Sequence, residues 1–536
     1  MHHLQHISEL GPLVEKQGVR HILIAPGSRN APLIQLFTSY PGFICHSIVD
    51  ERSLAYVALG MARQLGEAVV VLTTSGTAVL NLSPALAEAF HQKIPLLVLT
   101  ADRPREILSQ FNNQVTDQRA PYFNFSKGFF ELPAQLREHA DLEQGMQSVE
   151  NLFREAVSSP PGPVHLNLSL TEPLYESLPD PILSWEEAKL DPESASAGET
   201  LNADIKLAGK KVMIMAGMGP GDIRLQQVLE KLQTQMNVVV VAENISNLSS
   251  EHFISTPDLL LAGASEKERT ALAPELLISF GQQVVSKRLK LFVQELEDLE
   301  IHEIQDGFAL DEMKMELQTS GEPDLSFRAL WKELEERESG RAREYFKHAS
   351  FGNLTAVARI LEEAPAQMVI HLGNSSTIRL SQVLTTRPDL LYYSNRGVSG
   401  IDGSLSAAVG AAMVSDLQHL LILGDLSFVY DSNALWNKSF PENLKIIVLN
   451  DGGGGIFRLL EGPDRMDFFE EFSVTHHPVS LELLSGAFGR RFSRAANMDE
   501  LDRQLEALFA PFKGPSVLEV DTSASENSRI FKELFL

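Results

Sequence analysis

The sequence predicts an α/β protein made of three doubly wound domains, each built on a parallel sheet. The first observation is length, because 536 residues correspond to about three domains of ordinary size. The second is the recurrence of short apolar runs, rich in β-branched residues, between longer helical patterns. The third is that many of these runs end at Gly, Asn or Asp, which is typical of the carboxyl ends of parallel strands.

The first set of runs predicts a first α/β domain over residues 1–178. We expect its strands at His21–Gly27, Gly42–Asp50, Glu67–Thr74, Pro95–Asp102 and Pro163–Leu170. A proline-rich polar stretch follows and ends in Ser194–Thr200, where neither a helix nor a strand pattern survives. We therefore place a linker there.

The second set predicts a central α/β domain over residues 195–335. Its expected strands are Lys211–Gly217, Asn237–Glu243, Asp258–Gly263 and Glu275–Gly281. The charged stretch Trp331–His348 predicts an exposed helix that leads into the third domain.

The third set predicts a third α/β domain over residues 350–536. Its expected strands are Met368–Gly373, Leu390–Asn395, His419–Asp425, Leu444–Asn450 and Ser516–Asp521. Ligands of open parallel sheets bind at the carboxyl ends of strands, so the residues directly after each run are the first candidates for a site.

Composition limits the class of function. The chain has 45 Lys and Arg against 71 Asp and Glu, a formal charge of −26, which disfavours binding of nucleic acid or anionic lipid. Its single cysteine, Cys45, excludes an internal disulfide framework and a zinc site of several cysteines. No apolar run reaches membrane-spanning length. We expect a cytoplasmic protein that neither inserts into a membrane nor binds nucleic acid.

The segment from Gly424 to Asp451 is the longest specific signal. Asp425 follows an apolar strand, we expect a helix to begin near Tyr430, and a second strand leads to Asp451 and the glycines 452–455. This arrangement would bring two acidic groups to one sheet edge, where carboxylates suit Mg²⁺ and free amides suit a phosphate. The alternative interpretations are a turn aspartate and a flexible glycine loop.

This segment resembles the cofactor-binding motif of the thiamin-diphosphate-dependent enzymes, a Gly-Asp pair followed some 25 to 30 residues later by an asparagine-rich turn. The resemblance implies thiamin diphosphate and Mg²⁺, with Mn²⁺ as the alternative metal. It makes residues 1–178 the pyrimidine-binding domain and residues 350–536 the diphosphate- and metal-binding domain. It also implies a catalytic glutamate from another domain that promotes loss of the cofactor's C2 proton, and Glu51 is the candidate. A single glutamate in a loop is otherwise most often a solvated carboxylate.

The resemblance narrows to the branch of menaquinone biosynthesis that joins a succinyl unit from 2-oxoglutarate to isochorismate. Matching motifs occur in all three expected domains. They are Ala25–Arg29, Thr100–Pro104, Asn113–Gln114, Ser286–Leu289, Gly373–Ser375 with Arg379, Ser394–Gly397, Gly400–Gly403, Gly424–Ser427 and Gly455–Phe457. Asp451 departs from the wider family, in which this position is commonly asparagine.

The resemblance assigns the site residues. The metal ligands would be Asp425, Asp451 and the backbone carbonyl of Gly453. Further cofactor contacts would come from Pro26, Glu51, Gly373, Asn374, Ile401, Gly424, Leu426, Ser427 and Ile456, with Ile401 supporting the bent cofactor. The substrate contacts would come from Ser28, Arg29, Arg103, Asn113, Gln114, Lys287, Arg288, Ser375, Arg379, Arg396, Phe457 and Leu460.

Six of these residues are cations at the starts of loops in a strongly acidic chain: Arg29, Arg103, Lys287, Arg288, Arg379 and Arg396. The two substrates together have four carboxylates, and guanidinium groups bind carboxylates well. An isolated arginine is more often a surface residue, and one of the adjacent pair Lys287 and Arg288 is expected to be structural.

The resemblance also implies a homodimer, or a dimer of dimers, with the active site at the interface. Two alternatives stay open. One is another thiamin-diphosphate-dependent 2-oxo acid decarboxylase or carboligase, and the other is a noncatalytic protein that retains the fold, which Glu51 and Asp425 disfavour.

Overall fold

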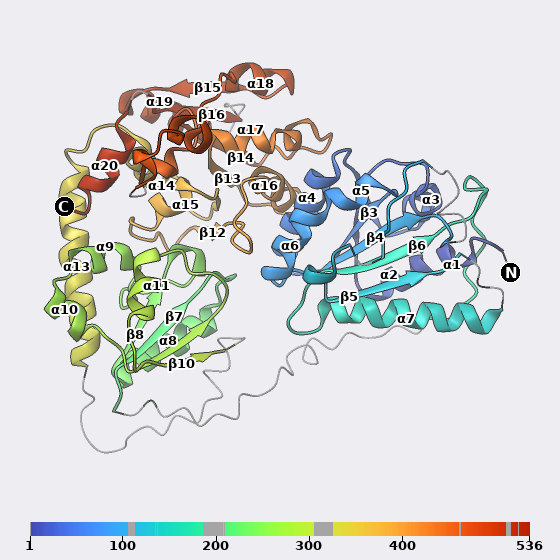
Figure 1. Ribbon diagram of the computed structural model, residues 1–536, viewed down its shortest axis with the longest axis horizontal. Helices are drawn as coiled ribbons and strands as arrows, with labels where there is room; N and C mark the ends of the chain where they lie inside the picture. The colour runs from blue at the N-terminus through green and yellow to red at the C-terminus, as the bar shows by residue number, and fades with distance from the viewer. Residues whose placement is uncertain are drawn as a thin grey trace. The chain divides into compact units, whose positions relative to one another are not determined.

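The computed structural model describes residues 2–105, 113–119, 121–134, 136, 138–185, 207, 209–304, 325–459, 462–510, 516–523 and 525–536 (Figure 1). Within these residues the chain forms three parallel sheets with helices packed on them, which confirms the α/β prediction. Two compact units contain them. One holds the first sheet with residues 395–416 and 430–443, and the other holds the second and third sheets.

The first sheet has six strands in the order β2-β1-β3-β4-β6-β5. The strands are β1 (His21–Ile24), β2 (Ile44–Ser47), β3 (Val69–Thr73), β4 (Leu96–Asp102), β5 (Gly128–Leu132) and β6 (Val164–Ser169). The accompanying helices are α1 (Gln5–Ser8), α2 (Leu10–Lys16), α3 (Ala31–Ser39), α4 (Glu51–Leu65), α5 (Thr77–Asn81), α6 (Ser83–His91), η2 (Phe123–Phe125) and α7 (His139–Val157).

The second sheet has four strands in the order β10-β9-β7-β8, and separate apolar cores lie on its two faces. Its strands are β7 (Val212–Ala216), β8 (Val238–Ala242), β9 (Leu276–Phe280) and β10 (Glu300–Glu303). Its helices are α8 (Ile223–Gln235), η4 (Asn244–Ser246), α9 (Pro257–Gly263), α10 (Glu266–Ala271), α11 (Lys287–Gln294) and α13 (Ser326–Phe346), the last of which packs along α9 (Figure 1).

The third sheet repeats the topology of the first, in the order β12-β11-β13-β14-β16-β15. Its strands are β11 (Val369–Leu372), β12 (Leu391–Tyr393), β13 (His419–Gly424), β14 (Leu444–Asn450), β15 (Phe492–Ala495) and β16 (Val517–Asp521). The helices of this part of the chain are α14 (Asn353–Glu363), α15 (Ser376–Ser381), α16 (Ser404–Met413), α17 (Asp425–Tyr430), η5 (Ser432–Trp436), η6 (Gly455–Leu459), η7 (Pro463–Arg465), η8 (Phe469–Val474), α18 (Leu481–Ala487), α19 (Met498–Phe509) and α20 (Asn527–Glu533).

The order of the strands shows where each six-stranded sheet has its topological switch point, the place at which the strand order reverses. In the third sheet the chain leaves β11 toward β12 and then returns to the other side of β11 as β13. The carboxyl ends of β11 and β13 therefore diverge into loops on opposite sides, which opens a crevice typical of ligand sites in this architecture. The loops concerned begin at Gly373 and Asp425. In the first sheet the equivalent switch lies between β1 and β3.

The crossing of α4 and α16 is the closest helix contact within the unit of the first sheet. A Cβ atom at Gly60 would lie 1.9 Å from the carbonyl oxygen of Ala407, and a Cβ at Gly410 would lie 1.9 Å from that of Val57. Only glycine allows this approach of the two backbones. The hydroxyl groups of Ser53 and Ser406 are also 2.9 Å apart. These contacts hold α4, which begins at Glu51.

Two predictions about secondary structure were wrong, and a third holds in part. Asp258–Gly263 is helix α9 rather than a strand, because Pro257 starts the helix and a short buried apolar run suits either element. The helix predicted over Trp331–His348 exists as part of α13 and exposes much of its charged surface, but its other face is buried, with Trp331 packed against the second sheet. The helix expected to begin near Tyr430 is α17, which begins at Asp425 and ends at Tyr430.

The expected linker Ser194–Thr200 lies outside the described residues, and the domain limits 1–178, 195–335 and 350–536 remain predictions. In the part of the chain that the structure describes, no helix combines the length and apolar character needed to cross a membrane.

Candidate functional site

The candidate metal centre lies at the carboxyl ends of β13 and β14. Gly424 pairs with Leu449 in the parallel ladder, so Asp425 and Asp451 reach the same edge of the sheet, as their spacing predicts. Asp425 is 1% exposed, accepts a hydrogen bond from the Leu426 amide at 2.8 Å and faces Nε2 of His477 at 3.1 Å. The carboxylate of Asp451 accepts from Nδ2 of Asn353 at 3.0 Å.

The two carboxylates influence each other electrostatically. Burial raises the pKa of Asp425 above its usual value. Burial also raises the pKa of Asp451 to about 7, and the negative charge of Asp425 adds to that shift. Two buried acids that oppose each other's ionisation are the donor set that a divalent cation stabilises. The residues present therefore fit the expected metal.

The glycines around this pair have different structural roles. A Cβ at Gly455 would lie 2.0 Å from Oδ2 of Asp451, so only glycine leaves room for that carboxylate. Gly453 has a φ of 150°, and a Cβ there would lie 2.5 Å from the carbonyl oxygen of Val474. A Cβ at Gly424 would meet no atom within 4 Å. Packing of the chain thus explains two of the three glycines, and Gly424 fits a diphosphate cradle instead.

The loop after β11 forms the other side of the same switch point. Gly373 and Asn374 are buried, and Ser375 has a φ of 74° directly before α15. Arg379, on α15, donates from Nη1 to the Ser375 carbonyl at 2.5 Å. Burial lowers the pKa of Arg379, and the charge of Asp258 opposes this shift.

Lys287 and Arg288 begin α11, close to Asp258. The carboxylate of Asp258 accepts from the Ser286 hydroxyl at 2.6 Å and from the Arg288 amide at 3.2 Å. The Arg288 guanidinium lies 4.2 Å from the centre of the Phe535 ring, whereas Lys287 is exposed. Asp258 thus binds the start of α11 and acts electrostatically on Arg379. Arg288 has the structural contact expected for one member of the pair.

A second group of predicted residues gathers at the switch point of the first sheet. Arg29 donates to the Leu170 carbonyl at 3.3 Å and pairs with Glu172 at 3.0 Å. Arg103 donates to the Gln114 carbonyl at 3.2 Å. Burial lowers the pKa of Arg103, and the positive charge of Arg29 contributes. Two neighbouring cations of this kind suit a carboxylate ligand.

The other predicted residues of this loop group are Pro26, Ser28, Asn113 and Gln114, all of which are exposed. Gln114 donates from Nε2 to the Ser75 carbonyl at 3.1 Å.

Glu51 is the first residue of α4, where the side chain of Asp50 caps the helix by accepting from the Ser53 amide at 2.8 Å. Glu51 lines a cavity of about 460 Å³ together with Asn81, Asn433 and Trp436. Nδ2 of Asn433 donates to Asp50, which ties the cap to η5. The candidate catalytic carboxylate therefore lies at a rigid helix start beside a cavity.

The remaining predicted residues lie in several environments. Arg396 is 8% exposed and Ser427 is 3% exposed, while Ile401, Leu426 and Ile456 are half-buried. Phe457 is 37% exposed. Leu460 lies outside the described residues.

Two residues at the metal centre were not predicted. His477 contacts Asp425, and Asn353 contacts Asp451, from segments that have no motif around them. The Asn450 side chain, by contrast, accepts from the Gly452 amide at 3.1 Å and donates to Glu519 at 2.6 Å. It therefore shapes the turn that presents Asp451.

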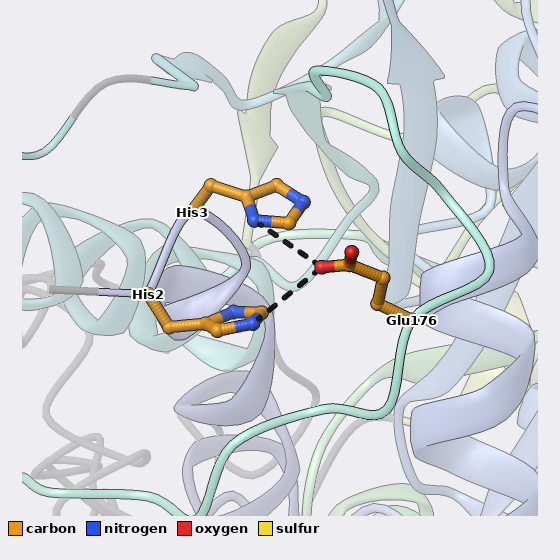
Figure 2. A group of neighbouring side chains, drawn as sticks. All are labelled: His2, His3 and Glu176. Atoms are coloured by element: carbon orange, nitrogen blue, oxygen red, sulfur yellow. Dashed lines mark ion pairs between the residues drawn. The ribbon is translucent and has the colours of Figure 1, made fainter.

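A separate cluster involves the first histidines of the chain. Among the described residues, one group of three His or acidic side chains brings its ligand atoms within 4.8 Å of one another, namely His2, His3 and Glu176 (Figure 2). Nε2 of His3 donates to the Pro173 carbonyl at 3.1 Å, which leaves Nδ1 to face Glu176. Nδ1 of His2 accepts from the Leu4 amide at 3.2 Å, so the proton of the neutral ring is on Nε2. With neutral rings the group thus offers two ligand atoms instead of three, and with protonated rings both histidines form ion pairs with Glu176. We therefore do not interpret it as a metal site.

Comparison with known proteins supports the assignment of the cofactor. The model of the thiamine pyrophosphate enzyme N-terminal TPP binding domain matches residues 12–120. The model of the thiamine pyrophosphate enzyme C-terminal TPP binding domain matches residues 373–520. These ranges contain Glu51 and the pair Asp425 and Asp451, respectively.

Curated relatives align over nearly the whole chain. The 2-succinyl-5-enolpyruvyl-6-hydroxy-3-cyclohexene-1-carboxylate synthase of Desulfotalea psychrophila is 40% identical, covering 96% of this chain and 98% of the relative. The enzymes of the same name from Flavobacterium johnsoniae and Porphyromonas gingivalis are each 34% identical, covering 97% and 99% of this chain. The chain therefore belongs to the 2-succinyl-5-enolpyruvyl-6-hydroxy-3-cyclohexene-1-carboxylate synthase family of thiamine pyrophosphate enzymes.

Proposed function

We propose that this chain decarboxylates 2-oxoglutarate and adds the resulting succinyl unit to isochorismate, which gives 2-succinyl-5-enolpyruvyl-6-hydroxy-3-cyclohexene-1-carboxylate for menaquinone biosynthesis. The observation that supports it most is the 40% identity, over nearly the full length of both chains, to an enzyme of that name. The buried acid pair at the end of β13 and β14 is consistent with it.

The metal would be held by Asp425, Asp451 and the carbonyl oxygen of Gly453. Carboxylate and carbonyl oxygens favour a hard divalent cation, so Mg²⁺ is our first choice and Mn²⁺ the second. A cation between the two acids would neutralise the charge of Asp425, which adds to burial in raising the pKa of Asp451. Helix α17 begins at Asp425, and the amides of its first turn suit a diphosphate group.

Thiamin diphosphate, when bound, supplies the electron sink for loss of carbon dioxide from a 2-oxo acid. Glu51 would hold a proton beside the aminopyrimidine, and its place at the capped start of α4 keeps its backbone fixed. A rigidly held acid or base is the arrangement that general acid–base catalysis needs.

The cations bind and orient the substrates in this proposal. Arg29 and Arg103 form one group at the first sheet, and we assign Lys287 on α11 and Arg379 on α15 to a second group. Arg396, which is largely buried, would contribute a further guanidinium. Each group can hold a carboxylate by charge-assisted hydrogen bonds, against the overall negative charge of the chain.

The proposed assembly is a homodimer, or a dimer of dimers, in which Glu51 and Asp425 of each active site come from different subunits. It rests on the family, since the catalytic glutamate and the metal ligands belong to separate domains. An enzyme with a shared site of this kind is inactive as a monomer.

The test is incubation of the purified chain with thiamin diphosphate, Mg²⁺, 2-oxoglutarate and isochorismate, followed by mass spectrometry. We expect the mass of the named product, and we expect its formation to require all four additions. Carbon dioxide release without incorporation of isochorismate would favour another 2-oxo acid decarboxylase or carboligase. No decarboxylation under any of these conditions would contradict the proposal.

A further inference from the structure

Among the residues that the structure describes, three buried glutamates share one unusual contact. Each uses both carboxylate oxygens to accept hydrogen bonds from the amides of two consecutive residues in a loop distant in sequence. Glu9 binds Ile182 and Leu183 at 2.7 and 3.2 Å, Glu88 binds Gly397 and Val398 at 2.6 and 2.7 Å, and Glu243 binds Ser286 and Val285 at 2.6 Å each. All three glutamates are at most 1% exposed. We call them the bidentate glutamates.

Two of the three bind backbone directly beside a candidate substrate cation. Glu88, on α6, holds the two residues that follow Arg396. Glu243, at the end of β8, holds the two residues that precede Lys287. Glu9 holds a segment without a candidate site residue, and it therefore provides a natural control.

The contact at Glu88 is supported by close backbone packing. A Cβ at Gly397 would lie 2.6 Å from the carbonyl oxygen of Glu88, so glycine is needed for the loop to approach α6. Gln92 also donates to the Glu88 carboxylate, just as Gln5 donates to Glu9. The loop after Arg396 is thus held by a fully satisfied buried acid.

The contact at Glu243 belongs to a larger arrangement within the unit of the second and third sheets. The neighbouring residue Asn244 donates from Nδ2 to the Ser381 hydroxyl at 3.2 Å, at the end of the helix that contains Arg379. The β8 loop therefore holds the backbone beside Lys287 and the helix of Arg379 at once. A buried carboxylate costs free energy unless its oxygens accept hydrogen bonds, and both oxygens of Glu243 do so.

We propose that Glu88 and Glu243 are positioning residues that fix the backbone beside Arg396 and Lys287, so that both cations are preorganised for substrate carboxylates. This inference rests on the proposed function. Preorganised contacts reduce the cost of ordering a side chain on binding, so loosening either loop should weaken substrate binding more than it slows turnover.

The experiment compares Glu88→Gln and Glu243→Gln with Glu9→Gln. Each replacement keeps the shape of the side chain but turns one acceptor oxygen into a donor that faces a backbone amide. Hydrogen exchange of the peptides around residues 395–400 and 283–288 reports the order of each loop, and thermal unfolding reports stability. Steady-state kinetics with 2-oxoglutarate and isochorismate then separate KM from kcat.

We expect all three variants to lose a comparable amount of stability. Only Glu88→Gln and Glu243→Gln should exchange faster in their own loop and raise KM for at least one substrate by about 10- to 100-fold, with a smaller change in kcat. Gly397→Ala should raise KM in the same way with the Glu88 carboxylate intact, so the test holds even if Glu88→Gln does not fold. Glu243→Asp, which keeps both acceptor oxygens, should recover part of the effect.

Equal KM values in all three glutamine variants would overturn the inference and leave these glutamates as stability residues only. Unchanged hydrogen exchange in both loops would also overturn it, whether or not the enzyme is active. An inactive wild type with faster exchange in the variants would instead contradict the proposed function alone.

Discussion

Replacing Gly455 with alanine should displace the carboxylate of Asp451. The added Cβ would lie 2.0 Å from Oδ2 and 2.8 Å from Cγ of Asp451. Favourable contacts between heavy atoms lie at roughly 3.5 to 4.0 Å, so the carboxylate must move by about 1 Å or more. That movement would also strain the 3.0 Å hydrogen bond from Asn353.

The structure gives the size of the expected effect. Metal ligands tolerate deviations of about 0.2 Å, and misplacing a functional group by about 1 Å can cost about 10²-fold. We expect Gly455→Ala to raise the Mg²⁺ concentration needed for cofactor binding by about 10²-fold. Isothermal titration of thiamin diphosphate at a series of Mg²⁺ concentrations measures this directly.

Gly340 serves as a matched control, and Gly424 provides a second test of the site. A Cβ meets no atom within 4 Å at Gly340, inside α13, or at Gly424. Gly340→Ala should leave cofactor binding unchanged and stabilise the helix by about 0.5 to 1 kcal/mol. Gly424→Ala should leave thermal stability unchanged but weaken cofactor binding. Wild-type Mg²⁺ dependence in Gly455→Ala would refute the assignment of Asp451 to the metal centre.

Four further predictions follow from the site. Glu51→Gln should keep the fold and cofactor binding but reduce kcat by about 10² to 10⁴-fold, since an amide cannot exchange the required proton, and near-normal turnover would remove Glu51 from its role. Arg379→Ala and Arg396→Ala should each weaken substrate binding by about 1.5 to 3 kcal/mol with little change in thermal unfolding, and unchanged kinetics would make them structural. Refolded mixtures of inactive Glu51→Gln and Asp425→Ala subunits should recover activity through mixed dimers with one intact site, whereas mixtures that stay inactive would contradict a shared site. The last prediction concerns Asp431. Burial raises the pKa of Asp431 to about 7, the positive charge of Arg52 opposes this shift, and the negative charge of Asp402 adds to it. Because the folded state favours its protonated form, the stability it contributes is present below its usual pKa of 3.8 and is lost as the pH rises through about 7. Asp431→Asn should therefore reduce the fall in melting temperature between about pH 5 and about pH 8, and an unchanged fall would show that Asp431 ionises normally.

The sequence predicted the central strands of all three sheets because those strands are buried on both faces and so appear as continuous apolar runs. It did not predict β5, β10 and β15, which lie at sheet edges and are half-exposed. These three strands lack a continuous apolar run, whereas the edge strands β2, β8 and β12 were predicted from theirs. A short buried apolar run suits either a strand or a helix, which is why helix α9 was predicted as a strand.

The candidate site was predictable where its residues directly follow strands. Asp425 and Asp451 meet because β13 and β14 are neighbours, and their spacing already indicated this. His477 and Asn353 reach these acids from other segments through tertiary packing, which leaves no pattern in the local sequence. The bidentate glutamates are hidden for the same reason, since an isolated glutamate in a helix or loop is usually solvated.

The central claim is that this chain transfers the succinyl unit of 2-oxoglutarate to isochorismate with thiamin diphosphate as cofactor. The most direct test supplies 2-oxoglutarate labelled with carbon-13 either at its first carbon or at the other four, together with isochorismate, cofactor and Mg²⁺. We predict that the label of the first carbon appears only in carbon dioxide and that the other four labels appear together in a product that contains the isochorismate ring. Four-carbon label that never joins isochorismate, or first-carbon label retained in the product, would contradict the account.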